Sequence, residues 1–210
     1  MNDKKRFLKE AYKLEGGEDV RELYDDWAKV YDTELMSENE YQQPARCTAA
    51  LLDFVKQGAG AIFDAGCGTG LAGEGLANAG YGPIDGCDFS QGMLDKAKAR
   101  NIYRTLFTAD LNQPLTQIED CAYAGVAVVG VFSYGHVDAD AVDELLRITA
   151  PGGAVVIGIN DKYYAEGSLI AKLRDVDASG AARLAHEEHG DHIPGIGMGG
   201  WVFVVRKSAA

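Results

Sequence analysis

The segment that decides the fold is IFDAGCGTG, residues 62–70, in which a short apolar run leads through one carboxylate into alternating small residues. Its glycines are Gly66, Gly68 and Gly70. A glycine lets the backbone approach a ligand at places where a Cβ would clash. The turn itself needs only these glycines, yet Asp64 precedes them. The segment therefore predicts a ligand that carries a positive charge or several hydrogen-bond donors.

Strand-like and helix-like segments alternate on both sides of this turn. Strands are expected at 61–66, 83–89, 103–110, 123–132 and 154–160, and helices at 69–80, 91–100, 139–150 and 163–174. Ser90 and Asp138 are expected to cap two of the helices, and Pro-Gly-Gly at 151–153 is expected to form a turn. Two late strands, 181–188 and 200–207, follow with a glycine-rich loop between them. This order predicts an α/β fold with a doubly wound sheet.

The first part of the chain does not follow the alternation. Residues 1–58 look helical, with Pro44 in the first turn of a helix, and they are too few for a separate domain. We expect one domain over residues 1–210, made of a helical extension (1–58) and an α/β core (59–210).

Composition excludes several classes of partner. The formal charge of −12 and the pI near 4.7 disfavour nucleic acid, because phosphate backbones are bound by clustered Lys and Arg. The longest apolar run, at 124–132, is far shorter than the roughly 20 residues of a membrane helix. The charged N-terminus has no signal-peptide core, and the cysteines show no zinc spacing. The expected protein is cytoplasmic and acts on a small molecule, without nucleic acid, membrane or metal.

Three ligands compete for the glycine turn. A phosphate-binding loop would need Lys after its last glycine, and Leu71 follows Gly70 here. A dinucleotide fold needs a glycine at position 71, and Asp64 would repel its pyrophosphate. S-adenosylmethionine carries a cationic amino group that Asp64 could contact. Asp88 and Asp110, expected at the ends of the next two strands, could then accept from the ribose hydroxyls and the adenine amino group.

The motifs DAGCGTG, GCDFSQGMLDKA, TADL and APGG occur in this order over residues 61–160. Together they resemble the motifs of class I S-adenosylmethionine-dependent methyltransferases. YDDWAKVYD (24–32) and VGVFSYGHV (129–137) resemble more narrowly the methyltransferase-like proteins of the Williams–Beuren syndrome region type. The resemblance implies a Rossmann-like, seven-stranded, mostly parallel sheet whose last strand is antiparallel. It also implies the following cofactor-binding residues: Tyr24, Trp27, Tyr31, Asp64, Gly66, Cys67, Gly68, Asp88, Phe89, Met93, Asp110, Leu111 and Val129.

Two segments are candidates for closing the site and for meeting the substrate. Tyr24, Trp27 and Tyr31 share a helix face, and the resemblance implies that they cover the cofactor, with Tyr41 and Arg46 as weaker candidates. FSYGHV follows the fourth strand at its carboxyl end. The residues expected to contact the substrate are therefore Phe132, Ser133, Tyr134 and His136. His136 could also act as a general base, with Tyr134 as the other catalytic candidate, or it could simply fix the loop.

HEEHGDH places His186, His189 and His192 three residues apart. Positions three apart on a strand point to opposite faces, and Gly190 would break a helix, so no regular element presents all three to one metal. A solvated loop is expected there.

These observations predict an enzyme that transfers the methyl group of S-adenosylmethionine to an O, N or S atom of a small-molecule acceptor. S-adenosylhomocysteine would be the second product. The alternative is a non-catalytic module that binds either compound and acts with a protein partner. A monomer or a homodimer is expected, and the sequence leaves the acceptor open.

Overall fold

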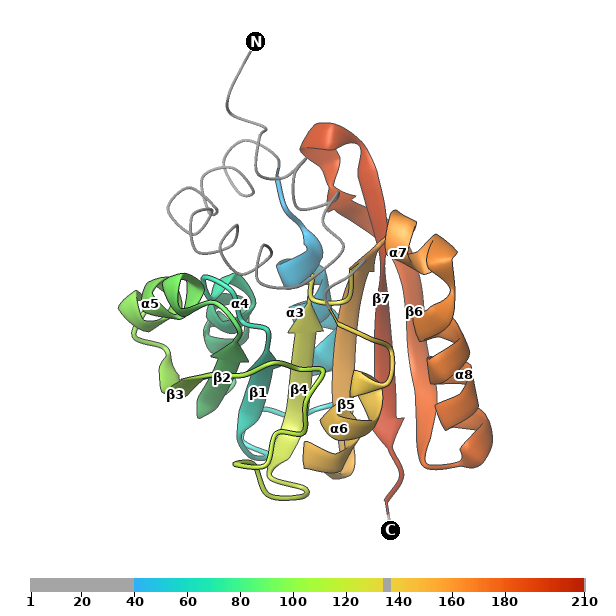
Figure 1. Ribbon diagram of the computed structural model, residues 1–210, viewed down its shortest axis with the longest axis horizontal. Helices are drawn as coiled ribbons and strands as arrows, with labels where there is room; N and C mark the ends of the chain where they lie inside the picture. The colour runs from blue at the N-terminus through green and yellow to red at the C-terminus, as the bar shows by residue number, and fades with distance from the viewer. Residues whose placement is uncertain (1–39, 134–136, 210) are drawn as a thin grey trace.

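The computed structural model describes residues 40–133 and 137–209, which form a seven-stranded sheet in the order β3-β2-β1-β4-β5-β7-β6 (Figure 1). β7 is antiparallel to both β5 and β6, whereas the other neighbouring strands are parallel. The predicted fold class is therefore confirmed. The strands are β1 (Ile62–Ala65), β2 (Ile84–Asp88), β3 (Tyr103–Thr108), β4 (Tyr123–Val129), β5 (Thr149–Asn160), β6 (Ala182–Ile193) and β7 (Met198–Lys207).

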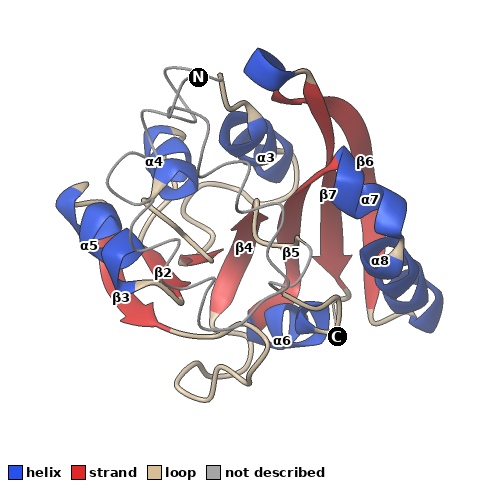
Figure 2. Ribbon diagram, turned by 45° about the horizontal axis from the view of Figure 1, so that its top comes forward, coloured by secondary structure: helices blue, strands red, loops and turns tan. Residues whose placement is uncertain are grey.

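Helices cover both faces of the sheet (Figure 2). On one face lie α3 and α4, and on the other lie α6, α7 and α8, while α5 packs against β2 and β3. The helices are α3 (Gln43–Leu52), α4 (Leu71–Asn78), α5 (Gln91–Ala99), α6 (Ala141–Ile148), α7 (Asp161–Glu166) and α8 (Ser168–Ser179). None of the helices in the described part of the chain is long and apolar enough to cross a membrane.

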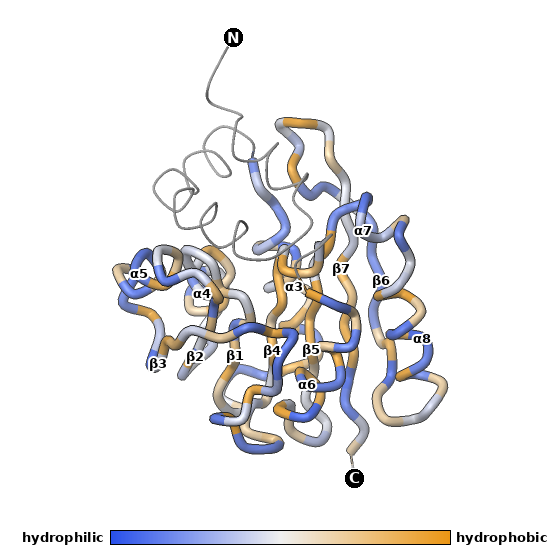
Figure 3. The backbone as a smooth tube through the Cα atoms, in the orientation of Figure 1, coloured by the Kyte–Doolittle hydropathy of each residue, from blue (hydrophilic) through white to orange (hydrophobic). Residues whose placement is uncertain are grey.

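The central strands β4 and β5 are buried on both faces, and Figure 3 shows them as the hydrophobic middle of the sheet. Val126 and Val128 point into the cluster under α6 and α8, whereas Ala127 points into the cluster under α3 and α4. This alternation follows from the two-residue period of a strand. Continuous burial explains why the sequence reads as an unbroken apolar run.

The local start and stop signals are confirmed at two helices. The Ser90 side chain caps α5 by accepting from the Met93 amide at 3.1 Å. Gly80 follows α4 in the left-handed region, with φ 87°. At α6 the expectation was wrong, because the N-cap is Asp140 rather than Asp138 and its side chain makes no capping bond.

Four boundaries also differ from the expectation. The expected helix 163–174 is two helices, because Gly167 interrupts it in the left-handed region, with φ 91°. β5 begins at Thr149 and includes the Pro-Gly-Gly segment that was expected to form a turn. The register of the β4–β5 pairing shifts between Tyr123 and Gly125, opposite this segment. β3 ends at Thr108, before Asp110. The histidine-rich segment is a strand and not a loop, because β7 offers β6 an antiparallel ladder along this segment, with register shifts between Leu184 and His186 and between Asp191 and Ile193.

Candidate functional site

The glycine turn lies at the topological switch point of the sheet. β1 has β2 on one side and β4 on the other, and open α/β sheets bind ligands beyond the carboxyl ends of strands at such a point. Gly66 and Gly68 adopt left-handed φ values of 69° and 53°. A Cβ on Gly66 would lie 2.4 Å from Val131, whereas a Cβ on Gly68 would have no atom of the described residues within 4 Å. With respect to the described part of the chain, the turn is thus closed on one side and leaves open space at Gly68.

Asp88 holds this turn against the end of β2. Its Oδ2 accepts from the Gly68 amide at 2.8 Å, and its Oδ1 accepts from the Ser90 amide at 3.0 Å. A carboxylate has about four lone-pair sites, so these bonds are compatible with further donors from a ligand. Asp88 therefore fixes the position of Gly68 relative to β2.

Asp64 is a buried carboxyl group with one oxygen in use. It is 1% exposed, and its Oδ2 accepts from the Tyr103 hydroxyl at 2.7 Å. Oδ1 has no hydrogen-bond partner among residues 40–133 and 137–209. Burial, with a smaller effect of the same sign from the Asp88 charge, raises the pKa of Asp64 to about 7, against the smaller opposing effects of the Tyr103 hydroxyl and the Gly73 backbone amide. An unpartnered buried oxygen of this kind suits a ligand that brings a positive charge or a donor.

Tyr103 belongs to the site although the sequence analysis did not single it out. Its hydroxyl reaches Asp64 from β3 because Gly73 on α4 has no side chain. A Cβ on Gly73 would lie 2.1 Å from the Tyr103 oxygen. A glycine inside a helix costs stability relative to alanine. Gly73 was therefore a signal in the sequence that a side chain from another element packs closely against α4.

Comparison with known proteins assigns these residues to a domain type. Residues 62–153 match the family model of a methyltransferase domain. The match agrees with the domain type expected from the motifs, and it contains Asp64, Asp88 and Tyr103.

Two curated relatives carry methyltransferase or methyltransferase-like names. Human methyltransferase-like protein 27 is 32% identical over 137 residues, which are 64% of this chain and 55% of that protein. Demethylmenaquinone methyltransferase from Paenarthrobacter aurescens is 30% identical over 142 residues, which are 67% of this chain and 54% of that protein. The chain thus spans about half the length of either relative.

Solved structures share the fold at low identity. The N-methyltransferase NodS from Bradyrhizobium japonicum, in complex with S-adenosyl-L-homocysteine, gives a TM-score of 0.67 at 18% identity, over 89% of this chain and 97% of that one. The cyclase SpnF gives a TM-score of 0.70 at 17% identity, over 93% of this chain and 97% of that one. Because one of these proteins is named a methyltransferase and the other a cyclase, the fold alone does not assign a reaction.

The remaining cofactor residues expected in the methyltransferase domain differ in burial. Met93 and Leu111 are buried, Cys67 is buried beside Leu94 and Ala97 of α5, and Phe89 and Val129 are half-buried. Asp110 is exposed, and its Oδ1 accepts from the Asn112 amide at 2.9 Å. Their contacts with a cofactor stay predictions.

The expected substrate-facing residues are only partly described. Phe132 is 1% exposed and stacks on Tyr163 in the core, with 6.4 Å between ring centroids, and Ser133 is half-buried. The contact of both residues with a substrate stays a prediction. The other candidates for this role and for the cofactor lid, Tyr134, His136, Tyr24, Trp27 and Tyr31, lie outside the described residues.

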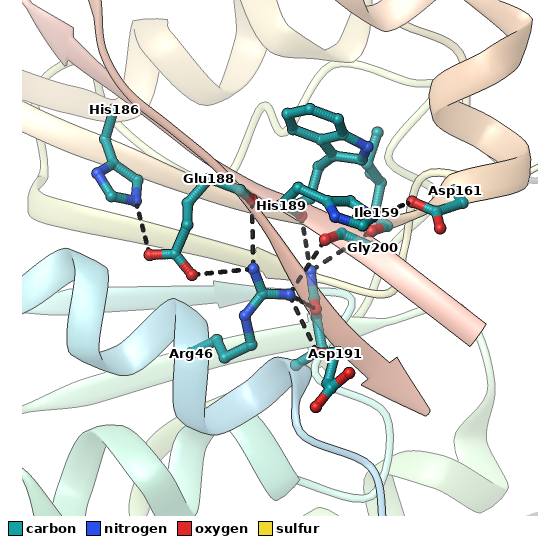
Figure 4. Close-up of polar contacts among 10 residues, drawn as sticks. Arg46, Ile159, Asp161, His186, Glu188, His189, Asp191 and Gly200 are labelled. Atoms are coloured by element: carbon teal, nitrogen blue, oxygen red, sulfur yellow. Dashed lines mark hydrogen bonds and ion pairs between the residues drawn. The ribbon is translucent and has the colours of Figure 1, made fainter. Parts of the chain in front are cut away.

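The weaker lid candidates Tyr41 and Arg46 lie where α3 meets the β6–β7 hairpin. Arg46 donates to the carbonyl oxygens of Asp191 and Gly200 at 3.0 and 3.1 Å, and it pairs with Glu188 at 3.1 Å (Figure 4). Tyr41 is buried, and a Cβ on Gly130 would lie 2.6 Å from its hydroxyl oxygen. Arg46 therefore fastens α3 to the hairpin, and Tyr41 lies at the carboxyl end of β4.

The three histidines of β6 do not converge. His186 packs on Phe54 of the α3 side, His189 contacts Trp201 and Asp161, and His192 is buried against Tyr41. Burial, and then the nearby Arg46 charge, lowers the pKa of His192 to about 4. Within the described residues, no group of three or more His, Cys, Asp or Glu side chains could hold a metal ion.

Proposed function

We propose that the chain is an S-adenosylmethionine-dependent methyltransferase that methylates an O, N or S atom of a small-molecule acceptor. The observation that carries the proposal is the buried, half-partnered Asp64 beside the glycine turn of a methyltransferase domain. The human relative, methyltransferase-like protein 27, supports a resemblance to methyltransferase-like proteins, and the narrower resemblance to the Williams–Beuren syndrome region type stays part of the proposal. The helical lid (1–58) and α/β core (59–210) are part of the proposal.

The residues present suit S-adenosylmethionine, which supplies an electrophilic methyl group when bound. Asp64 would bind the cationic amino group, the open space at Gly68 would admit the methionine part, and Asp88 would accept from the ribose hydroxyls. Phe89, Met93 and Leu111 would surround the adenine. Methyl transfer needs chiefly alignment of two reactants, so this chain's own contribution is to hold the acceptor at the end of β4.

The relatives differ in acceptor. Their names include demethylmenaquinone methyltransferase and malonyl-[acyl-carrier protein] O-methyltransferase. The acidic charge of this chain, −12, disfavours a nucleic-acid acceptor, and no single relative identifies the small molecule. The expected oligomeric state, a monomer or a homodimer, and the expected cytoplasmic location both stay predictions.

Calorimetric titration with S-adenosylmethionine and S-adenosylhomocysteine tests the proposal. We expect micromolar binding of both, with a large loss in an Asp88→Ala variant. Asp95→Ala is the matched control, because it removes the same charge from the exposed side of α5. Absence of binding by the folded wild-type protein would overturn the proposal.

A further inference from the structure

A histidine–carboxylate pair lies at the same edge of the sheet as the cofactor site. His189 on β6 and Asp161 at the start of α7 are joined with 2.9 Å between Nε2 and Oδ1 (Figure 4). Their side chains are 50% and 46% exposed. His189 is in register with Trp201, and Trp201 with Ile159 near the end of β5. The pair is therefore at the carboxyl end of β5, the strand next to β4.

Gly199 on β7 leaves the space in which the pair forms. A Cβ at this position would lie 2.5 Å from Oδ2 of Asp161 and 2.9 Å from Nε2 of His189. The φ of Gly199 lies outside the left-handed region, so its backbone conformation does not require glycine. The contact with the pair accounts for the missing side chain.

The chemistry of the pair defines what it can bind. A carboxylate only accepts, so Nε2 of His189 carries the hydrogen that faces Asp161. In a neutral imidazole the other nitrogen, Nδ1, is then an acceptor. Within residues 40–133 and 137–209 the His189 ring is held through Nε2, on the side that faces Asp161. The pair therefore offers an oriented acceptor to an O–H or N–H donor.

Aromatic rings border this acceptor. The Trp201 ring is 4.9 Å from the His189 ring, and Tyr164 of α7 stacks on Trp201 at 4.2 Å. Trp201 and Tyr164 are only half-buried. Ring edges and faces of this kind favour a planar ligand.

The short helix α7, which begins at Asp161, connects the pair to the loop after β4. Tyr163 of α7 stacks on Phe132, and its hydroxyl donates to the Val137 carbonyl oxygen at 3.4 Å. Because α7 carries both Asp161 and Tyr163, it links the pair to the loop from which substrate contacts are expected.

We propose that His189 and Asp161 bind a protic O–H or N–H group on a planar ring of the methyl acceptor, through Nδ1 of His189. The inference rests on the proposed function and adds a chemical class to its acceptor, an aryl alcohol or aryl amine. Adjacent strands lie about 4.8 Å apart, and β6 is three strands from β4. The group bound here is thus roughly 10–15 Å from the end of β4, and it is distinct from the atom that receives the methyl group.

Nuclear magnetic resonance titration of the full chain tests the inference. The probes are phenol, aniline and benzoate at pH 8. The ring signals of His189 are assigned by their loss in a His189→Asn variant. We expect phenol and aniline to shift these signals with dissociation constants on the order of millimolar. Benzoate, which offers no donor, is expected to leave them unchanged.

Variants separate the pair from the fold. Asp161→Asn and Gly199→Ala are each expected to weaken phenol binding roughly 2- to 12-fold, the effect of one hydrogen bond. Gly199→Ala keeps both functional groups and only displaces them. His186→Asn is the matched control on the same strand, where His186 is 27% exposed, and it is expected to change nothing.

The outcomes are distinguishable from those of the proposed function. Each titration is run with and without S-adenosylhomocysteine, so that the pair is tested whether or not that compound binds. Failure of phenol and aniline to shift the His189 signals would overturn the inference, as would benzoate binding equal to that of phenol. Failure of S-adenosylhomocysteine to bind would count against the proposed function alone.

Discussion

Removal of the Tyr103 hydroxyl should destabilise this protein in a way that depends on pH. Tyr103 donates to Asp64 at 2.7 Å, and burial raises the pKa of Asp64 to about 7 from an ordinary value of 3.8. Between these two values the folded state holds a proton that the unfolded state has lost. The Asp64 contribution to the free energy of unfolding therefore falls as the pH rises from about 4 to about 7, and it is constant above that.

The size of this contribution follows from the two pKa values. A difference of about 3 pH units corresponds to roughly 4 kcal/mol. Tyr103 limits this penalty, because its hydroxyl favours the charged form of Asp64. In a Tyr103→Phe variant the pKa of Asp64 should therefore rise further, and the pH range over which stability falls should extend upward.

The expected loss of stability is larger at pH 8 than at pH 5. A hydrogen bond to a charged group contributes about 1.5–3 kcal/mol and a neutral one about 0.5–1.5 kcal/mol. Tyr103→Phe should thus cost roughly 1–2 kcal/mol more at pH 8, where Asp64 is charged in the wild type. Urea unfolding of both proteins at the two pH values measures this difference, and other titrating groups cancel in it.

Tyr81→Phe is the matched control. The Tyr81 hydroxyl is also buried, but it donates to the Val55 carbonyl oxygen at 2.7 Å, which does not titrate. Its loss should cost the same at both pH values. If Tyr103→Phe lowered the free energy of unfolding equally at pH 5 and pH 8, the Tyr103 hydroxyl would contribute only packing. That result would refute the conclusion that Asp64 changes its charge between these pH values.

Three further expectations concern the same elements. Binding of S-adenosylmethionine near pH 6.5 should release a proton as Asp64 becomes charged, which calorimetry in buffers of different ionisation enthalpy measures; heats independent of the buffer would contradict it. Gly68→Ala, at φ 53°, should cost about 1–2 kcal/mol of stability and also cofactor affinity. Gly152→Ala, at φ 74° and far from the turn, should cost only stability, so equal affinity losses would be evidence against the turn as the site. Arg46→Met should lower the free energy of unfolding by about 2 kcal/mol through its lost bonds to the hairpin, and unchanged urea unfolding would exclude that anchoring role.

The sequence by itself determined the elements whose signals are local. The alternation of an apolar run, a glycine turn and a helical pattern is set by neighbouring residues, so β1, β2 and β4 were predicted close to their observed bounds. Ser90 and Gly80 marked helix ends because each acts on the backbone within a few residues. The cofactor class was predicted from Asp64-to-Gly70 together with the later motifs in their order, since an acid before a glycine turn narrows the ligand only to one with a positive charge or several donors.

Only the tertiary structure decided which distant groups meet. Tyr103 and Asp64 are 39 positions apart, and His189 and Asp161 are 28 positions apart. Nothing local to either partner specifies the other, because the contact depends on strand order and on the space left by Gly73 and Gly199. The histidine-rich segment was predicted as a loop for the same reason. Its polar residues satisfy no local strand pattern, and the antiparallel ladder of β7 supplies the hydrogen bonds that make it a strand.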